Sequence, residues 1–275
     1  MDLNTRAPLN DGHTIPQLGL GVYQTQPGPA VVNASLWALE AGYRHIDTAH
    51  IYLNEAGVGE AIHKSGLSRE QLYVTTKLWN SDHGYDQTLR ACDASLKELG
   101  LDFIDLYLVH WPVEHKRLDS WRAMERLKKD GKVKSIGISN YMKRHVQELL
   151  DHCEIPPVLN QIEMNPFIYQ YRKDTIDFCE AHKICIESYS PLTKGRRLDD
   201  SRLQTLAAQH HKTPAQILIR WSLQKGFITI PKSANQNRIQ ENAHVYDFEL
   251  SAANMQVLDD MDEQYVTSWD PTDAP

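Results

Sequence analysis

The chain has 275 residues, of which 41% are hydrophobic, with a formal net charge of −7 and a pI near 6.0. This acidic balance argues against a nucleic-acid partner or an anionic membrane surface, and no stretch approaches the roughly 20 consecutive apolar residues that cross a bilayer. The length suits either two small domains or one α/β barrel of about 250 residues.

Cysteine and histidine spacing argues against a disulfide framework and a metal site. The cysteines form no Cys-x-x-Cys pair, as is typical of reduced thiols in a cytosolic protein; they are Cys92, Cys153, Cys179 and Cys185. Among the 13 histidines, the stretch from His110 to His115 is one residue too long for a His-x-x-Glu-His zinc motif. We therefore expect no metal. The first residues lack a basic segment and an apolar stretch, so we expect a cytoplasmic protein.

A tight hairpin is predicted at the start of the chain, because Asp11-Gly12 separates two short extended runs. From Gln17 onward, short apolar or β-branched runs alternate with longer segments of helical periodicity. The eight short runs are Leu18 to Val22, Tyr43 to Asp47, Leu72 to Lys77, Phe103 to His110, Val133 to Ile138, Val158 to Ile162, Ile184 to Tyr189 and Phe227 to Ile230.

The helical segments between these runs predict a closed (β/α)8 TIM barrel with right-handed crossovers, an N-terminal β-hairpin and an extra C-terminal helix. They are Ala30 to Glu40, Ala56 to Lys64, Tyr85 to Leu99, Asp119 to Lys129, Lys143 to Asp151, Tyr171 to His182, Pro214 to Gln224, Arg238 to Ala243 and Ser251 to Met261. The competing fold is an open doubly wound sheet, but Gly19-Leu20-Gly21 lacks the third glycine and the helix start of a dinucleotide fingerprint. No linker interrupts the pattern, so we expect residues 1–275 to form one domain.

The stretch from Gly42 to Glu55 places a carboxylate, Asp47, and a phenol, Tyr52, on one strand-to-helix loop. In a parallel barrel such loops gather at the carboxyl ends of the strands and carry the chemistry. The residues at or just past the eight strand ends are Tyr23, Asp47, Lys77, His110, Asn140, Glu163, Ser190 and Lys232. Each residue alone has an ordinary structural explanation. Together they predict a polar ring, and we expect its residues to share one function.

Charge pairing suggests how this ring works. An ammonium at the rim of a buried barrel needs an anionic neighbour, and Asp47 is the obvious partner of Lys77. A lysine beside Tyr52 is expected to lower the pKa of the phenol from about 10 towards neutrality and make it a better acid. A neutral His110 at the end of an apolar run is expected to orient and polarise a substrate carbonyl. A hydride must then come from a nicotinamide or a flavin, because no side chain delivers one.

The chain resembles the aldo-keto reductase superfamily over essentially its full length. The resemblance is greatest to the branch of prostaglandin F synthases of protozoa, bacterial glyoxal reductases and 2,5-diketo-gluconate reductases. The matching motifs are Asp47-Thr48-Ala49 with Tyr52 and Asn54-Glu55, Thr76-Lys77-Leu78-Trp79, Leu108-Val109-His110-Trp111-Pro112, Gly137-Ile138-Ser139-Asn140, Asn160-Gln161-Ile162-Glu163, Ser190-Pro191-Leu192 and Ile230-Pro231-Lys232-Ser233.

This resemblance implies NADPH-dependent carbonyl reduction by a tetrad of Asp47, Tyr52, Lys77 and His110, with Tyr52 as the proton donor. It also implies that the nicotinamide carboxamide is held by Ser139, Asn140 and Gln161, and that Tyr189 stacks on the nicotinamide ring. At the other end of the cofactor, it implies that the 2′-phosphate is bound by Lys232, Ser233 and Arg238. The adenine is implied to be bound by Glu241 and Asn242. Further cofactor contacts are implied for Gly21, Val22, Asp47, Ser190 and Leu192. Two cations and a hydroxyl suit a dianionic phosphate, so NADPH/NADP+ is expected over NADH.

Three positions depart from the common pattern of the family: Asn165 stands in place of histidine, Tyr141 in place of phenylalanine and Tyr189 in place of tryptophan. None belongs to the tetrad. A tyrosine at 189 can still stack, but the change is expected to affect cofactor affinity.

The aromatic residues Tyr23, Trp79 and Trp111, together with His110, are expected to surround the substrate carbonyl. The neighbouring loop and the C-terminal tail are short, although Trp269 could fold back over the opening. We therefore expect a shallow site for small aldehydes, α-dicarbonyls or oxo-sugars, in a monomer.

Three other functions stay open at this level. The chain could be a prostaglandin F synthase-like reductase or a non-catalytic NADPH-binding subunit. It could also be a barrel aldolase or isomerase in which Lys77 forms a Schiff base.

Overall fold

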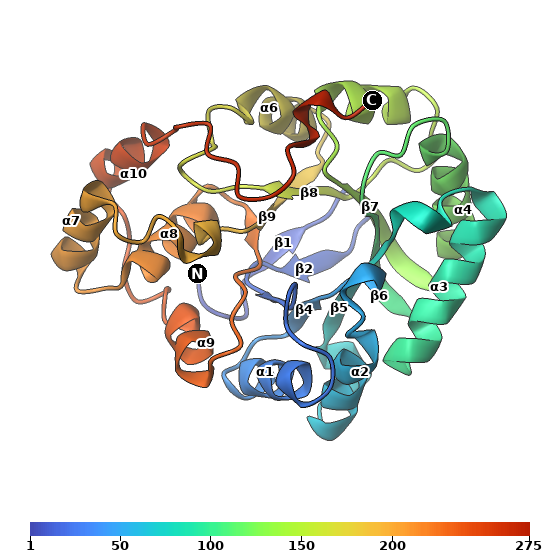
Figure 1. Ribbon diagram of the computed structural model, residues 1–275, viewed down its shortest axis with the longest axis horizontal. Helices are drawn as coiled ribbons and strands as arrows, with labels where there is room; N and C mark the ends of the chain where they lie inside the picture. The colour runs from blue at the N-terminus through green and yellow to red at the C-terminus, as the bar shows by residue number, and fades with distance from the viewer.

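The short β-branched and apolar runs form eight parallel strands, and the computed structural model describes them within residues 1–275 as the inner ring of a (β/α)8 barrel (Figure 1). The strands are β3 (Leu20–Gly21), β4 (His45–Asp47), β5 (Tyr73–Leu78), β6 (Ile104–Val109), β7 (Val133–Ser139), β8 (Leu159–Glu163), β9 (Cys185–Tyr189) and β10 (Ile228–Thr229). Each pairs with the next along the chain, and parallel bridges from Leu18 to Thr229 and from Gly21 to Lys232 join the first strand to the last. The predicted barrel is confirmed.

Ten helices surround this ring (Figure 1). They are α1 (Pro29–Glu40), α2 (Glu55–Lys64), α3 (Tyr85–Leu99), α4 (Arg117–Lys129), α5 (Lys143–Leu150), α6 (Lys173–Ala181), α7 (Ser201–His210), α8 (Pro214–Gln224), α9 (Gln236–Ala243) and α10 (Ala252–Asp259). None of them combines the length and apolarity that a membrane crossing requires. Helix α7 differs from the predicted pattern, in which the segment between β9 and α8 has no helix. Its start is capped by Asp200, which accepts a hydrogen bond from the backbone of Arg202.

The predicted hairpin consists of β1 (Arg6–Pro8) and β2 (Thr14–Pro16), with Gly12 at a positive φ of 88° in the turn. Two of its side chains, Leu9 and Ile15, pack inside the barrel against Leu106 and Leu159. Because this cluster also includes residues at the starts of strands, the hairpin closes the end of the barrel opposite the predicted site.

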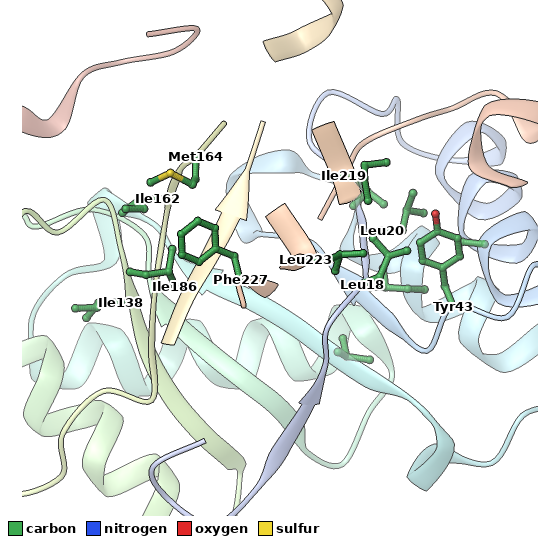
Figure 2. Packing of buried hydrophobic residues seen from close by; sticks show 14 of the residues in the cluster. Leu18, Leu20, Tyr43, Ile138, Ile162, Met164, Ile186, Ile219, Leu223 and Phe227 are labelled. Carbon is green, nitrogen blue, oxygen red and sulfur yellow. The ribbon is translucent and has the colours of Figure 1, made fainter. Parts of the chain in front are cut away.

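The main apolar core lies between the strands and the helices. Figure 2 shows side chains of the sheet, such as Ile162 and Ile186, in the same layer as Ile219 and Leu223 of α8. Burial of each such side chain stabilises the fold by roughly 1.5–3 kcal/mol. This packing gives the strand ends a rigid support.

Candidate active site

The centre of the site is a buried ion pair at the carboxyl ends of β4 and β5. Lys77 Nζ lies 2.6 Å from Asp47 Oδ1, and the two side chains are 0% and 3% exposed. The same ammonium donates a hydrogen bond of 2.8 Å to the carbonyl oxygen of Thr48. A buried ammonium without such partners is penalised by several kcal/mol, and this pairing, which the sequence predicts, offsets that cost.

Tyr52 lies above this pair, at the end of the short helical turn His50–Tyr52. Its ring centroid is 5.2 Å from Lys77 Nζ. Asn54 fixes the loop, because its amide donates hydrogen bonds of 3.1 Å to the carbonyl oxygens of Val22 and Thr25 and accepts one of 2.7 Å from Thr48 Oγ1. The strand-to-helix loop therefore holds the phenol beside the ammonium.

The expectation that Lys77 lowers the pKa of Tyr52 towards neutrality is wrong for this geometry. Burial, followed by the nearby charge of Asp47, raises the pKa of Tyr52 well above its usual value near 10. The physical reason is that burial disfavours the charged phenolate and that the carboxylate of Asp47 adds a like charge nearby. Tyr52 therefore carries its proton at neutral pH.

His110 lies on the other side of Tyr52, just after β6. Its ring centroid is 5.8 Å from that of Tyr52 and 5.2 Å from that of Trp79, in edge-on arrangements. Burial and the charge of Lys77 hold the pKa of His110 well below 6.5. The imidazole is therefore neutral, and such a ring has one N–H to donate to an incoming oxygen.

The residues expected to hold the nicotinamide lie together at the ends of β7, β8 and β9. Ser139 Oγ donates a hydrogen bond of 2.8 Å to the carbonyl oxygen of Gln161, and Asn140 Nδ2 donates one of 3.0 Å to that of His110. The hydroxyl of Tyr189 donates to Asn140 Oδ1 at 2.9 Å. This last bond uses the tyrosine that departs from the common family pattern and ties its ring to the neighbouring strand end.

Gly21 and Val22 lie where the barrel closes. A Cβ at Gly21 would meet the carbonyl oxygen of Ile230 at 2.9 Å, so the two backbones approach too closely for a side chain. Val22 donates a backbone hydrogen bond of 3.0 Å to the carbonyl oxygen of Asp47. Tyr23, which follows, is 44% exposed, and its ring centroid is 5.0 Å from that of Tyr52.

Ser190 and Leu192 lie in the loop after β9. Ser190 has a positive φ of 48°, and its carbonyl oxygen accepts a hydrogen bond of 3.3 Å from Asn165 Nδ2. Leu192 is half-buried against the main core. In the same loop Lys194 Nζ donates to the carbonyl oxygen of Thr267 at 3.1 Å, which joins the loop to the C-terminal tail.

The residues expected at the 2′-phosphate lie apart from the tetrad, around the start of α9. Asn235 Oδ1 caps this helix by accepting from the backbone of Arg238 at 3.1 Å, and Ser233 Oγ accepts from the backbone of Asn235 at 3.1 Å. Lys232 and Arg238 are exposed. Partial burial alone lowers the pKa of Lys232, with no carboxylate contributing. Two such cations at a helix start, where the dipole disfavours them, fit an anionic ligand.

The two residues expected at the adenine follow on α9. Asn242 is buried, and Glu241 is half-buried and accepts a hydrogen bond of 2.8 Å from Thr213 Oγ1. The Glu241 carboxylate therefore also binds Thr213, the residue before the start of α8.

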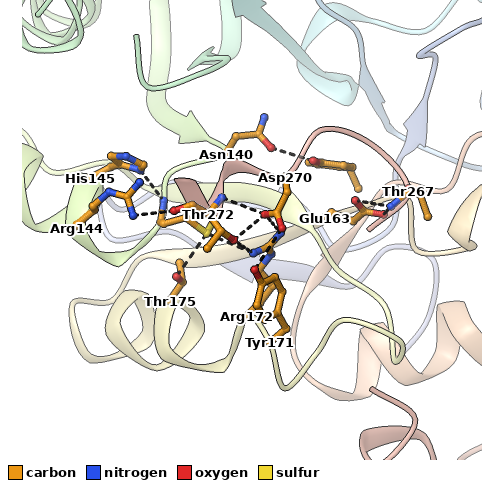
Figure 3. Close-up of polar contacts among 12 residues, drawn as sticks. Asn140, Arg144, His145, Glu163, Tyr171, Arg172, Thr175, Thr267, Asp270 and Thr272 are labelled. Atoms are coloured by element: carbon orange, nitrogen blue, oxygen red, sulfur yellow. Dashed lines mark hydrogen bonds and ion pairs between the residues drawn. The ribbon is translucent and has the colours of Figure 1, made fainter. Parts of the chain in front are cut away.

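The C-terminal tail, residues 263–275, crosses the mouth of the barrel, a feature that strand-end reasoning does not predict beyond the possible return of Trp269. Figure 3 shows its polar contacts: Glu163 accepts from the backbone of Thr267 at 3.0 Å, and Arg172 forms an ion pair of 2.7 Å with Asp270. Trp269 packs at 5.9 Å between ring centroids from Trp111. Glu163, a member of the predicted polar ring, thus holds the tail rather than pointing at the tetrad.

The chain is similar to several known proteins. Residues 17–263 match the Aldo/keto reductase family. A 9,11-endoperoxide prostaglandin H2 reductase of Trypanosoma cruzi is 47% identical over 266 residues, which cover 96% of this chain and 93% of that protein. A glyoxal reductase of Bacillus subtilis is 46% identical over 257 residues, covering 94% and 92% of the two chains. The solved structure of an aldo-keto reductase of Bombyx mori in complex with NADP has a TM-score of 0.91 at 36% identity, covering 98% of this chain and 96% of that one.

Proposed function

Because this chain belongs to the aldo/keto reductase family, whose members act on small carbonyl substrates, we propose that it reduces small carbonyl compounds to alcohols with NADPH. The observation that carries this proposal is the buried pair of Lys77 and Asp47 beneath Tyr52, with a neutral His110 beside it. These groups can donate a proton and polarise a carbonyl at the same place. That combination suits the addition of a hydride to a carbonyl carbon.

In the proposed reaction His110 donates a hydrogen bond to the substrate oxygen and Tyr52 donates the proton. The raised pKa of Tyr52 keeps the phenol protonated until the substrate oxygen becomes an alkoxide, a much stronger base than a phenolate. Lys77 then offsets the negative charge left on Tyr52, while Asp47 holds the ammonium in place.

The residues of this chain fit NADPH as the cofactor, which when bound supplies a hydride. We propose that Ser139, Asn140 and Gln161 hold its carboxamide and that Tyr189 packs against the ring. At the other end Lys232, Ser233 and Arg238 are proposed to hold the 2′-phosphate, since the exposed cations at the start of α9 need an anion. The remaining proposed contacts are Gly21, Val22, Asp47, Ser190, Leu192, Glu241 and Asn242.

The proposed substrates are small aldehydes, α-dicarbonyls and oxo-sugars. The rings of Tyr23 and Trp79 flank Tyr52 and His110, and Trp111 packs with Trp269 of the tail, so aromatic walls narrow the opening. The similarity to a glyoxal reductase supports the same class. The similarity to a prostaglandin H2 reductase supports a second candidate, a bulkier apolar peroxide or ketone, which a substrate screen distinguishes.

The contacts of Lys77 argue against a Schiff-base aldolase. Its amine is buried and donates to Asp47 and to the Thr48 carbonyl, so an attack on a substrate would have to break both contacts. Borohydride trapping of substrate on Lys77 would support the aldolase and contradict the reductase.

The test is NADPH consumption with methylglyoxal or an aromatic aldehyde, compared between the wild type and Tyr52→Phe. We expect the variant to lose about 10²–10⁴-fold in kcat, the usual contribution of a general acid, while NADPH fluorescence still reports binding. Tyr85→Phe, which alters an exposed tyrosine at the start of α3, is the matched control and should keep wild-type turnover. Full turnover by Tyr52→Phe would contradict the proposed acid, and NADPH binding without turnover of any carbonyl by the wild type would indicate a non-catalytic subunit.

A further inference from the structure

Below the ion pair of Asp47 and Lys77, the barrel interior contains a carboxyl group that the proposed reaction does not use. It belongs to Glu187, in the middle of β9, and its side chain is 0% exposed. Glu187 lies two residues before Tyr189, so both side chains point to the same face of the strand. A buried acid in a barrel interior is costly unless it is neutral or paired, and its presence requires an explanation.

Glu187 is joined to Asp47 through one amide. Gln161 Nε2, on the neighbouring strand β8, donates a hydrogen bond of 2.8 Å to Glu187 Oε2 and another of 2.8 Å to Asp47 Oδ2. An amide nitrogen has two hydrogens, so both are used by the two carboxyl groups. Since an amide oxygen could not accept from the ionised carboxylate of Asp47, that contact fixes the orientation of Gln161.

The charged groups around Glu187 do not balance if both acids are ionised. The titratable groups that face it are His45 and Asp47 on β4, Tyr52 on the following turn, Tyr73 and Lys77 on β5, and Cys185 and Tyr189 on its own strand. Burial holds the pKa of His45 at about 3 and raises the pKa of Cys185 and of the three tyrosines, so these groups are neutral at pH 7. Arg6 lies farther out on the hairpin, with its guanidinium over the Tyr73 ring. One cation, Lys77, therefore faces two carboxyl groups.

The contacts decide which acid keeps its charge. Asp47 touches Lys77 at 2.6 Å, whereas Glu187 reaches no cation, and its Oε1 makes no hydrogen bond and lies 3.8 Å from the neutral His45. An unpaired oxygen costs less on a neutral acid than on a carboxylate. In agreement, burial and the charge of Asp47 raise the pKa of Glu187 to about 8.

We propose that Glu187 is a positioning residue that holds a proton inside the barrel and, through the shared amide of Gln161, keeps Asp47 paired with Lys77 beneath Tyr52. This proposal rests on the proposed role of Tyr52 as the proton donor. When Glu187 loses its proton at alkaline pH, a second negative charge faces Lys77 and Tyr52. That charge disfavours the phenolate that forms as Tyr52 donates, so carbonyl reduction slows as the pH rises through the pKa of Glu187.

The first test is the pH profile of kcat/KM for NADPH-dependent reduction by the wild type and by Glu187→Gln, which keeps an acceptor for Gln161 but cannot ionise. We expect the alkaline loss of activity to shift upward by about one pH unit or more in Glu187→Gln. Glu125→Gln, which alters a buried glutamate on α4 outside the barrel interior, should keep the wild-type profile. An alkaline limb at the same pH in Glu187→Gln and the wild type would overturn the proposal.

The second test needs no turnover and so separates this proposal from the proposed function. Infrared difference spectra of the wild-type protein should show the carbonyl stretch of a protonated carboxylic acid that disappears as the pH rises through about 8. The band should be absent from the spectrum of Glu187→Gln. If Glu187→Gln fails to fold, Glu187→Ala takes its place, and the band should be absent from its spectrum. A wild-type spectrum without such a band would overturn the proposal that Glu187 is protonated, even if Tyr52→Phe is inactive. A titrating band in a protein that Tyr52→Phe leaves fully active would overturn only the role of Tyr52.

Discussion

Arg172 forms an ion pair of 2.7 Å with Asp270 while its own side chain is only 2% exposed. Arg172 immediately precedes α6, whereas Asp270 belongs to the C-terminal tail, so this contact is one of those that hold the tail across the barrel mouth. Arg172 also donates to Thr272 Oγ1 at 2.6 Å, and Arg144 of α5 donates to the backbone of Thr272 at 2.7 Å. The position of Trp269 against Trp111 therefore depends on the buried side chain of Arg172.

Asp270→Ala should loosen the tail. The substitution leaves Arg172 buried without its anion, and because Asp270 itself is 35% exposed we expect a loss of about 2 kcal/mol in the free energy of unfolding, below the usual cost for a fully buried pair. The KM for carbonyl substrates should rise, since Trp269 is no longer held at the opening. Urea unfolding and steady-state kinetics measure the two effects.

A matched control is Asp174→Ala, which removes the partner of Lys143 in a pair whose side chains are 76% and 48% exposed. An exposed pair contributes little, so its stability should change by less than about 1 kcal/mol. Equal losses in the two variants would mean that the burial of Arg172 does not matter for the tail.

Arg238→Ala should weaken NADPH binding by about ten- to a hundredfold and leave NADH binding nearly unchanged. The reason is that a charge-assisted hydrogen bond to a phosphate is worth about 1.5–3 kcal/mol and NADH lacks that phosphate. Fluorescence titration with each nucleotide gives the comparison, and Gln240→Ala, an exposed neighbour on α9, serves as the control. The assignment of Arg238 fails if both nucleotides lose affinity equally.

His110→Phe should lose about 10²–10³-fold in kcat, the usual cost of removing one donor to a developing oxyanion, and His110→Asn, which keeps a donor, should lose less. Because the pKa of His110 lies well below 6.5, the imidazole does not titrate near neutral pH. The wild-type rate profile should therefore show no step between pH 6 and 7, given the ordinary histidine value of about 6.5. A rate that rises with pH across this range would show that His110 loses a proton there.

Asp11 gives the hairpin a pH-dependent anchor on the barrel. Although burial acts to raise the pKa of Asp11, hydrogen bonds from Lys128 and Ser135 lower it from 3.8 to about 2. Since the folded-state pKa is depressed, the stabilisation is present above the unfolded value near 3.8 and is lost as the pH falls through about 2. Asp11→Asn should be less stable than the wild type by about 2 kcal/mol at pH 7, and thermal scans should show the difference vanishing towards pH 2.

The sequence predicts the strands and most helices because burial and chain geometry impose local periodicities. It also places Asp47, Lys77 and His110 at strand ends, where the barrel brings them together. Helix α7 is missing from the prediction because a polar, exposed sequence gives only a weak apolar stripe, although Asp200 marks its start.

The interior of the site is harder to predict from sequence. A search for polar residues at strand ends finds Ser190 but not Glu187, which lies within β9. The alternation of side chains along β9 nevertheless places residues 185, 187 and 189 on one face. The pKa of Tyr52 depends on its burial and on the nearby charge of Asp47, and no sequence pattern gives either. The contacts of the tail with Glu163 and Arg172 join residues about 100 positions apart, so only the folded chain reveals them.

The hairpin packs Leu9 and Ile15 into the end of the barrel opposite the candidate site, so that end is filled by apolar side chains. The polar strand ends are therefore presented at the other end only, where Tyr52 and His110 lie side by side.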